Sequence, residues 1–233
     1  MYKKVKRMTA TMRIFHWINA FSILAAVITG FYIADPYYAT SLADPAAEKY
    51  VMAYNRLIHF FSALLLDVVA IAIFYLYFRS RFEKVYKKII PTKQNIKEFW
   101  EVFLNLITLN RRKNFDSSHL DSFNAVYFTV LHLLLVWMLF TGFYMYVQGL
   151  ESGESAIGRW WPALLHLATD WVGWLLGGHA GVRWWHHFTM WIILAWVAFH
   201  IYYQVWRTIF WKEGDIGIVF GGYKFKRQSE EQV

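Results

Sequence analysis

Four long apolar stretches constrain the fold of this chain more than any other feature of its sequence. Each is close to, or longer than, the roughly 20 residues that a helix needs to cross the hydrocarbon core of a bilayer. The composition agrees, because 58% of the 233 residues are hydrophobic, and 13 Trp and 15 Tyr supply rings of the kind that gather at membrane interfaces. The predicted membrane spans are residues 14–33, 52–78, 123–147 and 182–211.

The basic residues predict the orientation of these spans. The net charge is +8, and Lys and Arg are concentrated before the first span, between the second and third spans, and after the fourth. The other two connections are mainly acidic. Because Lys and Arg accumulate in cytoplasmic loops, both chain termini are expected on the cytoplasmic side. The positive charge flanks membrane spans and does not form a nucleic-acid footprint, so no nucleic-acid partner is expected.

Two connections also carry helical patterns. Residues 95–109 and 160–178 place aromatic and aliphatic side chains at helical spacing, and each is expected to form a short helix in the membrane interface. Pro162, Asp170 and the glycines break the second segment too often for a fifth span. We therefore predict an all-α, integral membrane four-helix bundle that forms a single domain over residues 1–233.

The chain contains no cysteine. This excludes disulfides, c-type haem attachment and Cys-ligated iron–sulfur clusters within it. If the protein carries electrons, it must use a His-ligated metal or a diffusible carrier. Any iron–sulfur cluster must then belong to a partner chain.

Histidines inside the predicted spans are the strongest functional signal, because ionisable residues are costly in a bilayer. His186 and His200 are 14 residues apart, which places them about 40° apart around a helix and about 21 Å apart along it. One metal cannot use both, whereas two stacked centres can. The span directions then pair His16 with His200 towards the cytoplasm, and His59 with His186 on the outer side.

Two imidazoles at each level favour two bis-histidine b-type haems. Imidazole also binds Zn, Cu or Ni, but those sites usually draw three or four protein ligands. The sequence "TGFY" occurs at residues 29–32 and again at 141–144. Its Gly30 lies on the face of His16 at the opposite depth, where a glycine would let a macrocycle approach the backbone. Close packing of two helices explains this glycine equally well.

Several other polar residues in or near the spans have open roles. Arginines near the predicted ligands could meet haem propionates or extend to the membrane surface. His187 is about 100° from His186 and is expected to hydrogen-bond at the interface. His132 is expected to hydrogen-bond within the bundle, and Asp67 to be protonated or hydrogen-bonded, with His132 as one candidate partner. The arginines in question are Arg13, Arg56 and Arg183.

Several short motifs spread along the chain resemble the b-type cytochrome subunit of membrane-bound nickel–iron hydrogenases. The chain also resembles, more distantly, the cytochrome subunit of respiratory formate dehydrogenases. Each motif alone is weak, but they occur in the family's order over nearly the whole chain. They are "RIFHW" (13–17), "TGFYIADP" (29–36), "NRLIHF" (55–60), "WHHFTMW" (185–191) with "FH" (199–200), and "GGYKFKR" (221–227).

The resemblance implies a cytochrome of the bacterial or archaeal cytoplasmic membrane. It implies two b haems ligated by His16, His59, His186 and His200, and no hydrogen chemistry or catalytic residue on this chain. The implied partners are an iron–sulfur small subunit and a nickel–iron large subunit outside, membrane lipid, and quinone as electron acceptor, with a higher oligomer of the complex left open. The family has a non-ligand residue where His187 stands, so the choice between His186 and His187 stays open, although the spacing favours His186.

A quinone that receives electrons from the inner haem should bind near the start of the third span. His119, Asp121 and Asn124 could hydrogen-bond a quinone carbonyl there, although Asp121 and Ser122 also look like helix N-cap residues. Within the same class, a formate dehydrogenase cytochrome or another di-haem quinone-reducing subunit is the alternative. A haem-free membrane anchor or a transporter is a different class, and the broken, repeat-related helices of a transporter are not evident.

Overall fold

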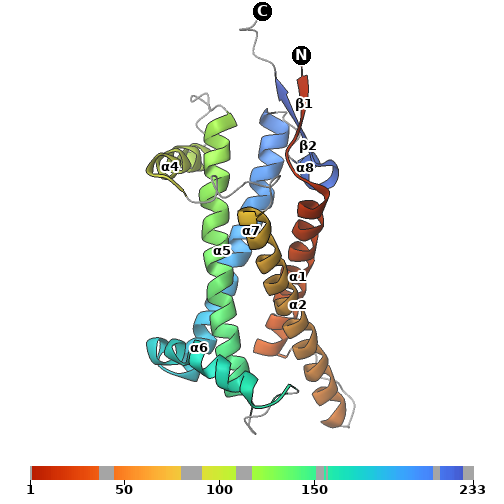
Figure 1. The fold of residues 1–233 in the computed structure, drawn as a ribbon, viewed down its shortest axis with the longest axis vertical. Coiled ribbons are helices and arrows are strands. Elements are labelled where there is room, and N and C mark those ends of the chain that lie inside the picture. The colour runs from red at the N-terminus through yellow and green to blue at the C-terminus, as the bar shows by residue number, and fades with distance from the viewer. Residues whose placement is uncertain are drawn as a thin grey trace, which may run out of the picture. The chain divides into compact units, whose positions relative to one another are not determined.

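The computed structural model describes residues 2–36, 45–79, 91–108, 117–150, 155, 157–211 and 216–227. Almost all of these residues are helical (Figure 1). The helices are α1 (Ala10–Ala34), α2 (Pro45–Arg79), α4 (Lys93–Thr108), α5 (Ser117–Gln148), α6 (Trp160–Leu176), α7 (His179–Trp206) and α8 (Ile216–Gly221). A π-helical turn, η1 (Arg207–Trp211), extends α7, and two strands are β1 (Tyr2–Lys6) and β2 (Tyr223–Arg227).

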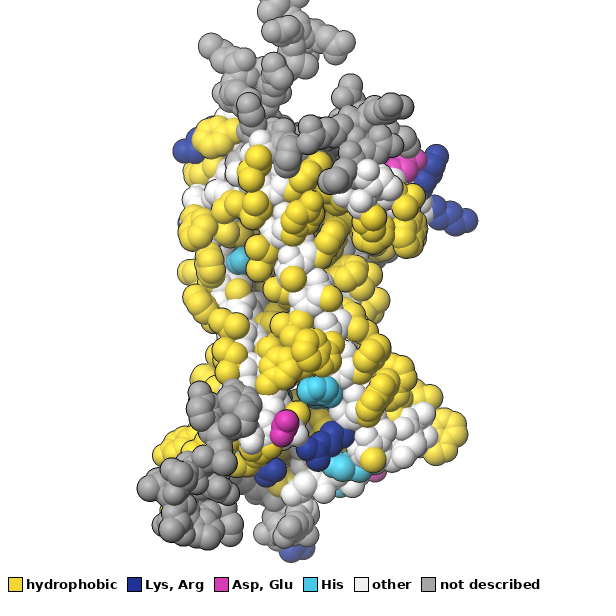
Figure 2. Space-filling model, turned by 180° about the vertical axis from the view of Figure 1, so that it is seen from behind, with side chains coloured by type: hydrophobic (Ala, Val, Ile, Leu, Met, Phe, Trp, Pro, Cys, Tyr) yellow, Lys and Arg dark blue, Asp and Glu magenta, His cyan; other side chains and the backbone are white. Residues whose placement is uncertain are grey.

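The prediction of four long apolar helices is confirmed. The helices long and apolar enough to cross a membrane cover Ala10–Ala34, Tyr50–Leu76, Ser122–Gln148 and His179–Ile209. They present large apolar side chains outward, and hydrophobic atoms cover most of the helical surface in Figure 2. Leu57, Phe61 and Leu64 on α2, for example, are each more than half exposed. An apolar surface of this extent is typical of a multi-pass membrane protein.

The chain forms two compact units: residues 1–73 together with 190–233, and residues 74–189. In the first unit the two ends of the chain pair, because β1 and β2 form an antiparallel ribbon with Tyr2 opposite Arg227 and Lys6 opposite Tyr223. The amide of Arg7 donates to the carbonyl of Gly222 over 2.8 Å, and Gly222 has a φ of 82°, which a glycine adopts without strain.

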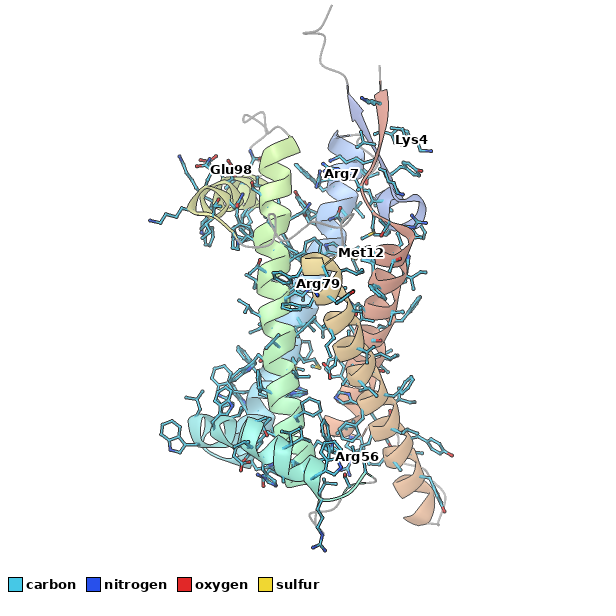
Figure 3. All side chains as sticks on the ribbon, in the orientation of Figure 1. Lys4, Arg7, Met12, Arg56, Arg79 and Glu98 are labelled. Atoms are coloured by element: carbon cyan, nitrogen blue, oxygen red, sulfur yellow. The ribbon has the colours of Figure 1, made fainter. Side chains whose placement is uncertain are left out.

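The ribbon was not predicted from the sequence. It sets Lys3 opposite Lys226, and like charges opposite each other disfavour strand pairing. Two other contacts favour the arrangement. The Lys4 ammonium (Figure 3 labels Lys4) lies 4.2 Å from the centre of the Tyr223 ring. The Trp17 indole N–H donates to the carbonyl of Val219 over 3.1 Å. The first contact joins the two strands, and the second joins α8 to α1.

In the second unit, both connecting helices pack on α5. Phe99 of α4 stacks on Phe123 of α5 with ring centres 4.8 Å apart, and the Asn95 amide donates to the Ser122 hydroxyl over 2.8 Å. On α6, Gly173 lies against the Tyr144 ring, where a β-carbon would overlap it. Helices therefore form in both connections, as predicted.

One local prediction about α5 is wrong. The sequence predicts Asp121 and Ser122 as N-cap residues, but α5 begins at Ser117. Both residues lie inside the helix, and Ser122 is 8% exposed. The apolar pattern begins only at residue 123, whereas the helical hydrogen bonds continue through the polar residues that precede it.

Candidate functional site

His16 of α1 and His200 of α7 face each other within the first unit. Their ring centres are 6.5 Å apart, and the ring planes are tilted by 48°. Two metal–nitrogen bonds of about 2 Å, plus about 1 Å from each nitrogen to its ring centre, would separate the rings by about 6 Å. The observed separation therefore suits a single metal ion held between the two imidazoles.

The donor set around this pair also limits the kind of metal centre. Among the described residues, no group of three or more His, Cys, Asp or Glu side chains could hold a metal ion. The described His, Cys, Asp and Glu residues therefore offer two imidazoles, and no third ligand, to a metal between His16 and His200. A porphyrin supplies four nitrogens in one plane and leaves two axial positions, so two imidazoles fit a haem iron.

His59 of α2 is held by α1 within the first unit. Its Nδ1 atom lies 2.9 Å from the carbonyl oxygen of Ala26 and 3.2 Å from the hydroxyl oxygen of Thr29. A carbonyl oxygen can only accept a hydrogen bond, so Nδ1 carries the hydrogen. Nε2 then keeps its lone pair and can bind a metal. Gly30 lies beside the same ring, and a β-carbon there would come within 3.3 Å of His59 Cε1.

His186 of α7 has the same arrangement with α5 in the second unit. Its Nδ1 atom lies 2.8 Å from the hydroxyl oxygen of Thr141. The Thr141 oxygen is also 3.0 Å from the carbonyl of Trp137 and 3.1 Å from that of Met138. The single hydroxyl hydrogen goes to a carbonyl, so the Thr141 oxygen accepts from Nδ1–H. Nε2 of His186 therefore keeps its lone pair, as Nε2 of His59 does. The choice of His186 over His187 as the ligand stays a prediction from the spacing.

Comparison with known proteins then identifies the family. The family described as prokaryotic cytochrome b561 matches residues 7–222 of this chain. The chain belongs to the prokaryotic cytochrome b561 family. Membership implies haem b, and the resemblance found in the sequence motifs is confirmed.

Three relatives are similar to this chain over most of its length. All three are named "Probable Ni/Fe-hydrogenase B-type cytochrome subunit". The protein of Cupriavidus necator is 25% identical over 92% of this chain and 84% of its own length. That of Bradyrhizobium diazoefficiens is 29% identical over 91% and 83%. That of Rhizobium leguminosarum bv. viciae is 29% identical over 95% and 89%.

The arginines singled out in the sequence differ in their surroundings. Arg56 on α2 and Arg183 on α7 are exposed, and each precedes a predicted ligand by three residues (Figure 3 labels Arg56). Arg13 also precedes its histidine by three residues. Its Nη1 lies 3.4 Å from the carbonyl of Gly221 and 3.5 Å from that of Met8. Arg13 thus contacts backbone carbonyls near the two chain ends, whereas Arg56 and Arg183 are exposed.

The remaining polar residues that the sequence singles out are Asn124, His119, His132 and Asp67. On α5, the Asn124 amide oxygen is buried and has no hydrogen-bond partner among the described residues, whereas the side chain of His119 lies outside them. His132 Nδ1 contacts the carbonyl of Phe128 on its own helix over 2.6 Å. This bond is to its own helix, so the role of His132 inside the bundle stays a prediction. Its predicted pairing with Asp67 stays a prediction, because the two residues belong to different units.

Sequence reasoning missed two kinds of residue in this cytochrome b561 protein. The repeated "TGFY" motif predicts a role for Gly30, but it does not predict one for the hydroxyls of Thr29 and Thr141. Sequence reasoning also missed Arg207, which is 1% exposed. Arg207 follows His200 by seven residues, and seven residues are about two turns of an α-helix. That spacing was the available signal.

Proposed function

We propose that this chain is the membrane anchor and electron-transfer subunit of a respiratory uptake hydrogenase, and that it holds two b-type haems. One observation carries the proposal: His16 and His200, from two membrane-length helices, stand 6.5 Å apart. That separation suits a bis-imidazole iron, and the family is a cytochrome family. When bound, haem supplies one-electron transfer, while the protein fixes its ligands, orientation and surroundings.

In this proposal the four span histidines act at two levels. His16 and His200 hold the haem nearer the cytoplasm, and His59 and His186 hold the haem nearer the outer surface. Arg56 and Arg183 would neutralise propionates one helical turn from their histidines. Arg207, at the start of η1 and seven residues after His200, would meet a propionate towards the cytoplasm. Gly30 leaves room for the His59 ring, because a β-carbon at this position would lie only 3.3 Å from His59 Cε1.

The proposed electron route runs from outside to inside. An iron–sulfur small subunit, bound to a nickel–iron large subunit, would deliver electrons at the outer surface. The names of the relatives support a hydrogenase assembly. The acceptor would be membrane quinone near the cytoplasmic side. On α6, Trp174 is 86% exposed and Leu167 is 84% exposed, so this helix offers an apolar surface to such a partner or to the lipid interface.

Purification of the tagged full-length chain from its native membranes tests this function. We expect about two haems per chain by pyridine haemochrome assay, and co-purification of an iron–sulfur chain and a nickel-containing chain. Addition of hydrogen should then reduce both haems. A haem-free chain would reject the cytochrome function. Two haems with partner chains that oxidise formate, and no reduction by hydrogen, would instead favour the formate dehydrogenase alternative.

We further expect the termini on the cytoplasmic side and α6 outside. The chain has no cysteine, so single introduced thiols report their side without background. Asp170→Cys, at a position 56% exposed on α6, should react with a membrane-impermeant maleimide in spheroplasts. Lys3→Cys, at an exposed position on β1, should react only after the membrane is permeabilised. The reverse labelling pattern would invert the proposed topology.

A further inference from the structure

Two helices in different halves of the sequence hold a histidine with the same motif. In "TGFY" of α1, the Thr29 hydroxyl lies 2.7 Å from the carbonyl of Ala25 and its oxygen contacts Nδ1 of His59. In "TGFY" of α5, the Thr141 hydroxyl lies 3.0 Å from the carbonyl of Trp137 and its oxygen contacts Nδ1 of His186. The following glycine lies beside the ring in both cases, with a β-carbon position 3.3 Å from His59 Cε1 and 3.6 Å from His186 Cε1.

The motif fixes both imidazoles in the same chemical form. Each threonine donates its only hydrogen to its own helix one turn back, which leaves its oxygen as an acceptor for Nδ1–H. A metal-bound histidine whose other N–H is hydrogen-bonded is held in one tautomer and one ring orientation, and it becomes a stronger electron donor. Gly30 lets α1 approach the His59 ring, and Gly142 lets α5 approach the His186 ring.

His16 is surrounded differently. Its Nδ1 atom is buried and has no hydrogen-bond partner among the described residues. A ligand without that hydrogen bond is a weaker donor than one that has it. Stronger donation stabilises the oxidised, more positive iron and lowers its reduction potential.

We propose that Thr29 and Thr141 are positioning residues that lower the reduction potential of the haem held by His59 and His186 below that of the haem held by His16 and His200. The inference rests on the proposed ligation by these four histidines. Both threonines would then have the same effect. Electrons that enter at the outer haem would move to the inner haem, which has the higher reduction potential. The difference in reduction potential between the two haems would arise from two neutral hydroxyls, so it requires no buried charge.

Replacement of each threonine by valine, which has nearly the same shape and no hydroxyl, tests the inference. Thr141→Val should leave about two haems per chain and raise the lower of the two midpoint potentials. We expect a change of about tenfold in the ratio of reduced to oxidised haem at a fixed potential, which for one electron is about 59 mV. The low-spin ferric EPR signal of the same haem should shift, and the other haem should not change.

The structure also predicts the order of the two effects. Thr29→Val should raise the same midpoint by less, because the Ala26 carbonyl remains 2.9 Å from His59 Nδ1. Thr141→Ser and Thr29→Ser keep the hydroxyl and should restore values near those of the unaltered protein. Thr169→Val is the matched control, because Thr169 is a buried threonine that bonds its own helix at Leu165 over 2.7 Å. It should move neither potential.

The outcomes separate this inference from the proposed function. If the unaltered chain lacks haem, or if His59→Ala and His186→Ala each leave both haems in place, the proposed function has failed. If those histidine variants each remove one haem but the valine variants leave both potentials unchanged, the threonine inference alone is overturned. Thr29→Val and Thr141→Val acting on different haems, or lowering the potential, would overturn it as well.

Discussion

Alanine at either His16 or His200 should remove one of the two haems, and it should remove the same one in both variants. The two rings stand 6.5 Å apart across a gap that suits one iron. Loss of either imidazole therefore leaves the same iron with a single protein ligand. Haem content should fall from about two to about one per chain, and redox titration should lose the same component in both variants.

The double variant His16→Ala/His200→Ala sharpens this test, because two residues that act on one centre are not additive. It should still retain one haem. Retention of none would mean that the two histidines serve different centres. His16→Met supplies a ligand that can bind iron, and it should keep both haems while raising one midpoint potential. His132→Ala is the control, because the His132 ring bonds its own helix at Phe128, and it should retain both haems.

The span helices were predictable because hydrophobic length is a local property. The ends of these helices were not predictable, because helical hydrogen bonds continue through flanking polar residues. A span that is defined by its apolar residues leaves those polar residues out. Helix α2 runs from Pro45 to Arg79 and α5 starts at Ser117, both beyond the predicted spans. The N-cap interpretation of Asp121 and Ser122 failed for this reason. The β1–β2 ribbon joins residues more than 200 positions apart, and no local pattern encodes that pairing.

The candidate site was predictable where it depends on helix geometry and topology. The 14-residue spacing of His186 and His200, with the direction of each span, was sufficient to pair His16 with His200. The hydroxyl contacts of Thr29 and Thr141 were not predictable, because a threonine in a span usually bonds its own helix and gives no sign of a second contact. The repetition of "TGFY" is the one sequence feature that marks these threonines, and the glycine in the motif offers a more obvious structural role than the threonine does.

Replacement of Asn124 with leucine should separate haem reduction from quinone reduction. The Asn124 amide oxygen is buried without a hydrogen-bond partner among the described residues, and an unpaired buried acceptor costs about 1–3 kcal/mol. A quinol hydroxyl that donates to this oxygen would remove that cost. Loss of a hydrogen bond worth about 1.4 kcal/mol should slow quinone reduction by about tenfold, while the haems are still reduced at the normal rate by the natural donor.

Three further variants locate the quinone site. His119→Ala should also slow quinone reduction if its ring relays protons from the cytoplasm. Asn19→Leu is the matched comparison on α1, because the Asn19 amide oxygen is likewise buried without a partner among the described residues. Normal rates for Asn124→Leu and His119→Ala would reject a site at the start of α5. A slow Asn19→Leu would then move the site to α1, beside the 430 Å³ groove that Trp17 and Phe220 line, and Trp17→Leu would test that groove directly.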